Sequence, residues 1–163
     1  MKSRMHVLAA AVALAACGSA AYAATVNNSF TVSVTLASRC VATNSGTATL
    51  DFGTYTAFQA TAQSPAAPVS LTFDCTRGLA PVSVAFDTTN GTAAGVGVLA
   101  GLQYSLSASA ASIVAGTAAS TSSIGTADGV TYSISGSMPA NQAGSCGTAS
   151  CAASHTRTLV VTY

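Results

Sequence analysis

Residues 69–75 read VSLTFDC, and apolar and polar side chains alternate along the first six of them. Side chains of a β-strand point to opposite faces in turn, so this segment has one apolar and one polar face. The same alternation recurs over residues 48–52, 82–86, 102–107 and 130–135. Because Gly, Pro, Ser and Asn stand between these runs, the sequence predicts short strands joined by turns.

The longest alternating run lies near the N-terminus and reads VNNSFTVSVTL, residues 26–36. Its apolar face carries Val26, Phe30, Val32, Val34 and Leu36. A last run, RTLVVTY, occupies residues 157–163, whereas the Ala/Ser/Thr/Gly-rich residues 108–126 are predicted to be a non-helical loop or a weak strand pair. About seven strands predict an all-β antiparallel sandwich. The 26–36 strand can pair in its own sheet or complete the sheet of a neighbour.

The first 23 residues have the form of an export signal. Lys2 and Arg4 precede an apolar stretch over residues 7–17, which is too short to span a bilayer. Residues 21–23 read AYA, a small-x-small signal peptidase site. We therefore predict a signal peptide over 1–23 and a single domain over 24–163.

A second interpretation of the N-terminus stays open. Residues 14–17 read LAAC and resemble a lipobox, which would place cleavage before Cys17 and acylate that residue. The site after Ala23 is favoured, because it lies where the first alternating run begins. No later segment is long and apolar enough to predict a membrane helix, so the mature chain is expected to carry no transmembrane segment.

The mature chain is long enough for one core and carries very little charge. Removing 23 of 163 residues leaves 140, with three Arg and four Asp and neither Lys nor Glu, a net charge of −1. A basic footprint for nucleic acid is absent. Since charge normally guards against association, this composition suits a subunit inside an assembly better than a free monomer.

Four cysteines remain after cleavage: Cys40, Cys75, Cys146 and Cys151. An even number in an exported chain predicts two disulfides. Three connectivities are possible, and we favour Cys40–Cys75 together with Cys146–Cys151. In the chain-entropy model the first bond is worth roughly 4 kcal/mol and the second about 2 kcal/mol.

The residue types that carry catalysis are scarce. The mature chain has one histidine, His155, for which a surface position is expected, and it has no Gly-x-Ser-x-Gly elbow. Four scattered Asp without Glu do not suggest a glycosidase pair. The spacing from Cys146 through Cys151 to His155 could hold a metal, but a disulfide is favoured in an oxidising compartment. We predict no enzyme, no cofactor and no metal site.

Several segments together resemble the spore coat protein U domain family, whose bacterial members are similar to subunits of archaic chaperone–usher pili. They are residues 30–40, 50–55 (LDFGTY), 71–78 (LTFDCTRG), 138–142 (MPANQ) and 157–163 (RTLVVTY). The resemblance spans essentially the whole mature chain. The FGTY element, the two framing cysteines and the closing VTY are specific in combination, although each is weak by itself.

The resemblance implies an immunoglobulin-like sandwich that lacks its final strand and is completed by donor-strand exchange. The donor strand would be residues 25–36, and the edge strand of the groove would carry Leu159, Val161 and Tyr163. A chaperone strand fills the groove first, and the N-terminal strand of the next subunit replaces it. An unfilled apolar edge would otherwise aggregate.

The implied function is that of a structural pilus subunit that supports adhesion and biofilm formation. The implied partners are copies of itself or sister pilins, a periplasmic chaperone and an outer-membrane usher, on a route through the periplasm to the cell surface. Two alternatives stay open: a secreted spore or cell coat protein, and a surface lipoprotein binding module if Cys17 is acylated. A tip adhesin is disfavoured, because such tips generally have two domains.

Overall fold

The computed structural model describes residues 25–44, 48–89, 91–120 and 124–163. The chain divides into two units, Met1–Thr35 and Leu36–Tyr163, and every assigned strand lies in the second unit. The predicted signal peptide, with its candidate cleavage and acylation sites, lies outside the described residues.

All regular structure in the described part of the chain is β-structure, as the alternating runs predict. The assigned strands are β1 (Cys40–Ala42), β2 (Val69–Cys75), β3 (Ser83–Phe86), β4 (Gly91–Ala93), β5 (Val96–Leu99), β6 (Leu102–Ala108), β7 (Ser112–Val114), β8 (Asp128–Ser137) and β9 (Leu159–Thr162). The three six-residue alternating runs inside the second unit thus became β2, β6 and β8.

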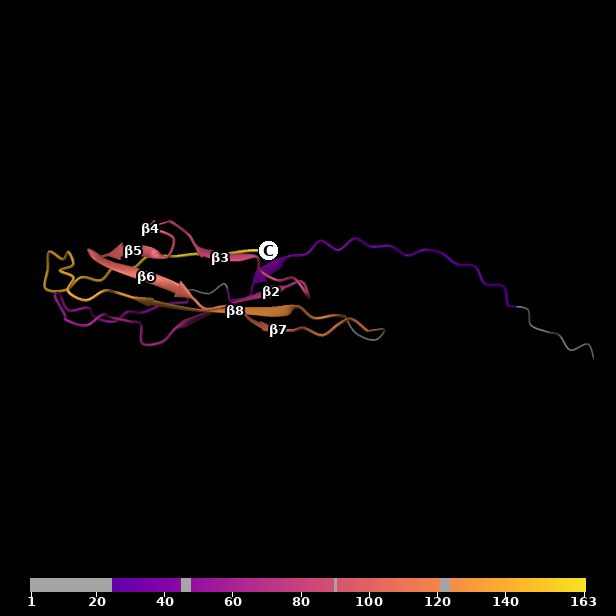
Figure 1. Ribbon diagram of the computed structural model, residues 1–163, viewed down its shortest axis with the longest axis horizontal. Helices are drawn as coiled ribbons and strands as arrows, with labels where there is room; N and C mark the ends of the chain where they lie inside the picture. The colour runs from indigo at the N-terminus through magenta and orange to yellow at the C-terminus, as the bar shows by residue number, and fades with distance from the viewer. Residues whose placement is uncertain (1–24, 45–47, 90, 121–123) are drawn as a thin grey trace, which may run out of the picture. The chain divides into compact units, whose positions relative to one another are not determined.

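The strands form two antiparallel sheets. The larger sheet has the order β1-β2-β8-β6-β5-β4, and β7 pairs with β8 alongside β6, whereas the smaller sheet holds only β3 and β9. Figure 1 shows β2, β8 and β7 in one layer and β3, together with the yellow C-terminal strand, in the other. The chain is therefore a sandwich of one large and one small sheet.

This order matches an immunoglobulin-like sandwich without its last strand. In the constant-type immunoglobulin sandwich, strands A, B, E and D form one sheet and strands C, F and G form the other. Chain order assigns β1, β2, β8 and β6 to A, B, E and D, and it assigns β3 and β9 to C and F. No strand among the described residues takes the position of G beside β9.

The pairing of β2 with β8 follows from their alternating sequences. The register runs from Val69 opposite Ile134 to Cys75 opposite Asp128. On the polar face, the hydroxyls of Thr72 and Thr131 are 3.0 Å apart. A shift by one residue would move each apolar set to the wrong face, so the hydrophobic pattern sets this register.

The core lies between the two sheets and is centred on β8. Val130, Tyr132 and Ile134 of β8 are buried, and Cys75 from β2 and Leu159 from β9 complete the cluster. Val130 is fully buried, with none of its surface exposed. The smaller sheet thus contributes through β9 to the same core that the larger sheet forms.

We name the two ends of the sandwich after the ends of β8. The Asp128 end also holds the Cys40–Cys75 pair, because these residues are opposite each other in β1 and β2. The Ser137 end holds the loop of residues 53–63, which bridges to Met138 through Gln63. In Figure 1 the golden loops after β8 lie at the left end of the sandwich and β7 lies towards the right end.

The predicted strand over residues 48–52 is wrong. Leu50 and Phe52 are half-buried as the alternation predicts, and Leu50 packs against the core, but no ladder forms. Side chains take up backbone groups instead, since the Asp51 carboxylate accepts from the Gly53 N–H and the Gln63 amide donates to the Phe52 carbonyl. Such local bonds compete with a ladder.

Four short strands were not predicted, namely β1, β4, β5 and β7. They are three or four residues long, and β4 and β5 contain glycine, so their alternation is too brief to recognise. The loop predicted over residues 108–126 is non-helical where described and contributes β7, while residues 121–123 lie outside the described residues.

The 26–36 run forms no strand of this chain's own sheets. No strand is assigned over residues 25–39, and each of these residues is exposed. The five side chains of its apolar face are between 74 and 91% exposed. Its pattern is that of a half-buried strand, yet its apolar face is in solvent, which is the discrepancy that any functional account has to explain.

Candidate functional site

The candidate site is the free edge of β9. The amide of Asp87 donates to the carbonyl of Thr158 across the β3–β9 ladder at 2.9 Å. Hydrogen-bonded pairs alternate along an antiparallel ladder, so the backbone groups of Leu159 and Val161 point away from β3. In the part of the chain that is described, no strand meets them. A row of unpaired N–H and C=O groups is a template for another strand.

The predicted edge residues differ in their burial. Leu159 is buried and Val161 is half-buried against the core, so both point inwards. Tyr163 lies just beyond the last residue of β9 and is 48% exposed. Two of the three side chains therefore line the inner face of the sandwich next to the free edge, and the third lies at its end.

Burial on the inner face of the large sheet falls off towards β1. The inward residues of β8 are buried, whereas their neighbours on β2, Val69, Leu71 and Phe73, are only half-buried. Phe73 contacts Tyr132 edge-on, with ring centroids 6.1 Å apart. The small sheet covers β8 and leaves β2 partly uncovered, so apolar surface is exposed where a strand G would lie.

The position of β3 explains which half is covered. Pro81, Val82 and Val84 line a cleft with Ala111 and Ile113, so β3 lies over the half of the large sheet that contains β7. Since β9 is next to β3, its free edge faces the other half, which contains β2 and β1. The open strand position and the half-buried face of β2 therefore coincide.

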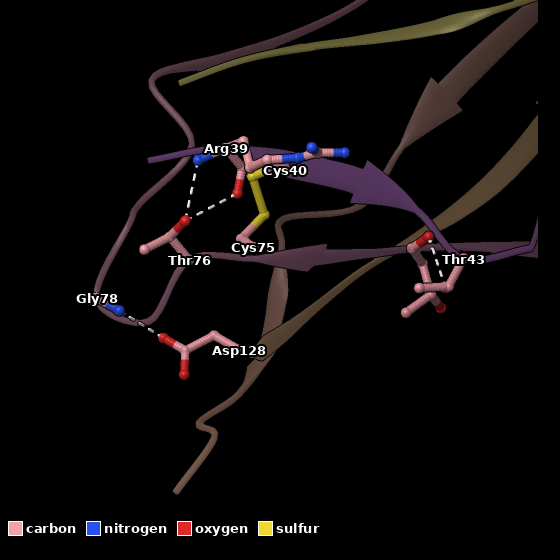
Figure 2. The surroundings of a disulfide bond; sticks show 8 residues. Arg39, Cys40, Thr43, Cys75, Thr76, Gly78 and Asp128 are labelled. Carbon is pink, nitrogen blue, oxygen red and sulfur yellow. Dashed lines mark hydrogen bonds between the residues drawn. A yellow bond between two sulfur atoms is a disulfide. The ribbon is translucent and has the colours of Figure 1, made fainter. Parts of the chain in front are cut away.

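The disulfide predicted between Cys40 and Cys75 is present, with the two sulfur atoms 2.03 Å apart. Beside it, Thr76 Oγ1 accepts from the Arg39 amide at 2.9 Å and donates to the Arg39 carbonyl at 3.2 Å (Figure 2). The backbone amide of Thr76 donates to the same carbonyl. These bonds fix the point at which the 26–39 segment enters the sandwich.

A buried carboxylate organises the loops at the same end. Asp128 accepts hydrogen bonds from the amides of Gly78 at 2.8 Å and Gly116 at 2.6 Å, and Figure 2 shows the first of these. These backbone hydrogen bonds hold the pKa of Asp128 below its ordinary value, and the charge of Arg77 adds to the effect. The carboxylate therefore ties the loops that carry Gly78 and Gly116 to the start of β8.

A polar network anchors the chain just before β9. Arg157 Nε is 2.9 Å from a carboxylate oxygen of Asp87, and its Nη1 donates to the Tyr104 hydroxyl at 2.9 Å. The hydrogen bond from Arg157 lowers the pKa of Asp87. Burial acts to lower the pKa of Arg157, but its bonds to Asp87 and Tyr104 raise it overall.

The expectation of a surface His155 is wrong, because this residue is half-buried and joins the network. Its Nδ1 lies 3.2 Å from the hydroxyl of Tyr104, which is only 3% exposed. The bonds among Arg157, Asp87, Tyr104 and His155 tie the residues before β9 to the end of β3 and to β6. The signal in the sequence was the scarcity of charge: in a chain with three mature Arg, each one is a candidate for an internal pair.

The second predicted disulfide, between Cys146 and Cys151, is also present. Both cysteines are exposed, in the long loop between β8 and β9. No group of three His, Cys, Asp or Glu residues within the described ranges is placed to hold a metal ion. Nor does any helix there have the length and apolar character that a membrane crossing requires.

The strand order and the open edge describe an immunoglobulin-like sandwich domain that is one strand short within the described residues. The family model of the Spore Coat Protein U domain matches residues 26–161. The chain therefore belongs to the Spore Coat Protein U domain family, as the resemblance of its motifs implied. No curated protein and no solved structure gives a significant match.

Family membership sets the broad class of function. Domains of this family occur in subunits of chaperone–usher pili, and the proteins are extracellular pilus or coat components. The family is a structural one rather than an enzyme family. These statements agree with a site that consists of a sheet edge and an apolar surface.

Proposed function

We propose that this protein is a structural subunit of a surface pilus, assembled by donor-strand exchange through a chaperone–usher route and supporting adhesion and biofilm formation. Residues 25–36 of one copy occupy the open strand position beside β9 of the next. The mature subunit spans residues 24–163, after removal of a signal peptide over 1–23. A periplasmic chaperone fills the edge until the usher brings two subunits together.

The observation that carries this proposal is that the chain has both an open strand position and an exposed segment with the pattern of a strand. In the described part of the chain, the sandwich has an edge at β9 that no strand pairs with, over a half-buried apolar face. The same chain has an exposed segment with the alternation of a strand. In strand addition, main-chain hydrogen bonds give affinity and alternate side chains enter pockets.

The apolar face of the donor segment supplies the driving force. Phe30, Val32 and Val34 are each more than 80% exposed. Burying one such side chain is worth about 1.5–3 kcal/mol, so the three contribute on the order of 5–9 kcal/mol as an upper bound. Val26 and Leu36 extend the same face at its two ends.

The test is a pair of substitutions one residue apart. Val32→Asp places a charge in the apolar groove of the neighbour, whereas Ser33→Asp places it on the opposite, polar face. We expect Val32→Asp subunits to bind the chaperone through their own β9 edge but to form no fibre, and Ser33→Asp subunits to polymerise. Electron microscopy of cells expressing each variant with chaperone and usher checks this; equal polymerisation of both would contradict the donor assignment.

The coat-protein alternative uses the same domain without an usher. Co-expression distinguishes the two, because a pilus subunit requires both chaperone and usher to reach the surface and a coat protein does not. The lipoprotein alternative depends on Cys17, which lies outside the described residues. The mass of the mature N-terminal peptide distinguishes cleavage before Ala24 from acylation at Cys17.

A further inference from the structure

Phe58 is displayed at the Ser137 end in an unusual backbone conformation. Its φ angle is 63°, in the left-handed region that bulky residues rarely adopt, and its side chain is 70% exposed. An exposed aromatic ring in a strained conformation gains nothing for the subunit by itself. Strain of this kind is maintained where the displayed side chain has a function.

The loop that carries Phe58 is held firmly by hydrogen bonds. The Phe58 amide donates to the Gln142 carbonyl at 2.8 Å, and the Asn141 amide donates to the Gln59 carbonyl at 2.8 Å. The Tyr55 hydroxyl adds bonds to the Pro139 carbonyl and the Gln142 amide. The ring therefore projects from a pre-organised support and not from a loose loop.

A cleft of about 380 Å³ lies at the opposite, Asp128 end. Its lining includes Leu36, Arg39, Cys75, Thr76, Arg77 and Thr126. Both arginines are exposed, and Figure 2 shows the Arg39 guanidinium extending away from the backbone bonds beside the disulfide. Asp74 lines the same cleft beside the two arginines, and Asp128 lies at this end as well, so these four side chains carry no net charge. Apolar lining with two guanidinium groups suits an aromatic ring, because cations are attracted to its face.

Donor-strand exchange would bring these two ends together. The strand β9 runs towards the Asp128 end, because it is antiparallel to β3, which begins there after β2. A strand that fills position G antiparallel to β9 runs towards the acceptor's Ser137 end. The donor chain then leaves the acceptor at its Leu36, and the donor's own Asp128 end follows directly.

We propose that Phe58 of each acceptor copy inserts into the Arg39–Arg77 cleft of the donor copy and forms a second contact at every joint of the fibre. This inference rests on the proposed donor-strand function and adds a residue-specific interface to it. The contact joins different surfaces of identical subunits, so it repeats head to tail along a filament.

Photo-crosslinking in assembled fibres tests the contact. Phe58→p-benzoylphenylalanine subunits are co-expressed with chaperone and usher, the fibres are irradiated, and crosslinked peptides are identified by mass spectrometry. We expect crosslinks between position 58 and residues 74–77 of another copy, which line the cleft but lie outside the donor segment. The control is Val84→p-benzoylphenylalanine, in the middle of β3, which should give no crosslinks to those residues.

Two further variants separate this inference from the proposed function. The double variant Arg39→Ser with Arg77→Ser should still form fibres but lower the yield of the position-58 crosslink roughly two- to tenfold, the range of an aromatic–cation contact. Fibres in which position 58 links elsewhere, or not at all, overturn the inference and leave donor-strand exchange standing. Fibres that form from Val32→Asp subunits overturn the proposed function, whatever the crosslinks show.

Discussion

Two segments of this chain have similar alternating patterns, but only one of them forms a strand. Residues 130–135 lie within β8, paired on both edges, and their apolar side chains form the core. Residues 26–36 carry a similar pattern with Asn28 as its one exception, yet no strand is assigned there and the apolar side chains are exposed. Alternation decides which side chains share a face, but a strand also requires a neighbouring edge that is free to pair. Within one copy, the free edge at β9 has no matching partner among the described residues.

The largest difference in stability is expected when the same charge is placed in each of the two segments. Val130→Asp buries a carboxylate where the side chain has no exposed surface, so we expect the subunit not to fold, with a loss of more than about 4 kcal/mol. Val32→Asp should leave the fold unchanged, because Val32 is 82% exposed. Circular dichroism of the two chaperone-bound subunits measures the difference, and equal damage would contradict the assigned roles.

Removing the Cys40–Cys75 disulfide should have the next largest effect. The double variant Cys40→Ser with Cys75→Ser opens a loop whose ends are 35 residues apart in the sequence. Its free energy of unfolding should fall by roughly 4 kcal/mol in the chain-entropy model. The double variant Cys146→Ser with Cys151→Ser opens a loop whose ends are only 5 residues apart, so its free energy of unfolding should fall by about 2 kcal/mol. Denaturant unfolding of fibres measures both losses of stability. A larger loss for the second variant would contradict the expected order.

Breaking the anchor before β9 should cost somewhat less. Arg157→Met removes one partner of a pair whose side chains are only 8 and 17% exposed, and it leaves the Asp87 carboxylate without its cation. Loss of one partner of a buried pair costs about 3 kcal/mol. We expect weaker chaperone binding and a lower melting temperature, whereas Arg157→Met with Asp87→Asn should recover part of both.

A change of pH within the physiological range should have the smallest effect on the stability of the subunit. The pKa values of Asp87 and Asp128 are lowered from 3.8, so their stabilisation is complete above that value and is lost as pH falls through the lowered values. We expect the contribution of these carboxylates to be constant from pH 7 to about 5 and to decline below about 4. Melting temperatures across this range check it, and Asp128→Asn should reduce the decline.

The sequence predicted the strands whose alternation is long enough to bury one face. The runs that became β2, β3, β6, β8 and β9 were each recognised, and the family resemblance was confirmed. The 48–52 segment shows why alternation alone does not make a strand. Its alternation matches its burial, but the Gln63 side chain, which binds the Phe52 carbonyl, replaces the ladder that the pattern predicts.

The candidate site was predictable in part. The apolar face of residues 26–36 and the closing strand were named from the sequence, because a period of two is a local property. The free side of β9 was not derivable from the pattern, since it depends on which strands of the fold lie on either side. The internal pair of Arg157 and Asp87 spans 70 residues and could not be assigned before the fold was known.

The sequence by itself determined the class of structure and the faces of the strands, because each depends on composition or on neighbours in the chain, and it predicts an export signal over residues 1–23. Only the tertiary structure decided that one edge of β9 meets no described strand, that β2 remains half-covered, and that Phe58 and the Arg39–Arg77 cleft lie at opposite ends. These properties depend on how distant segments pair, and pairing is determined by the packing of the whole chain and not by any single run of residues.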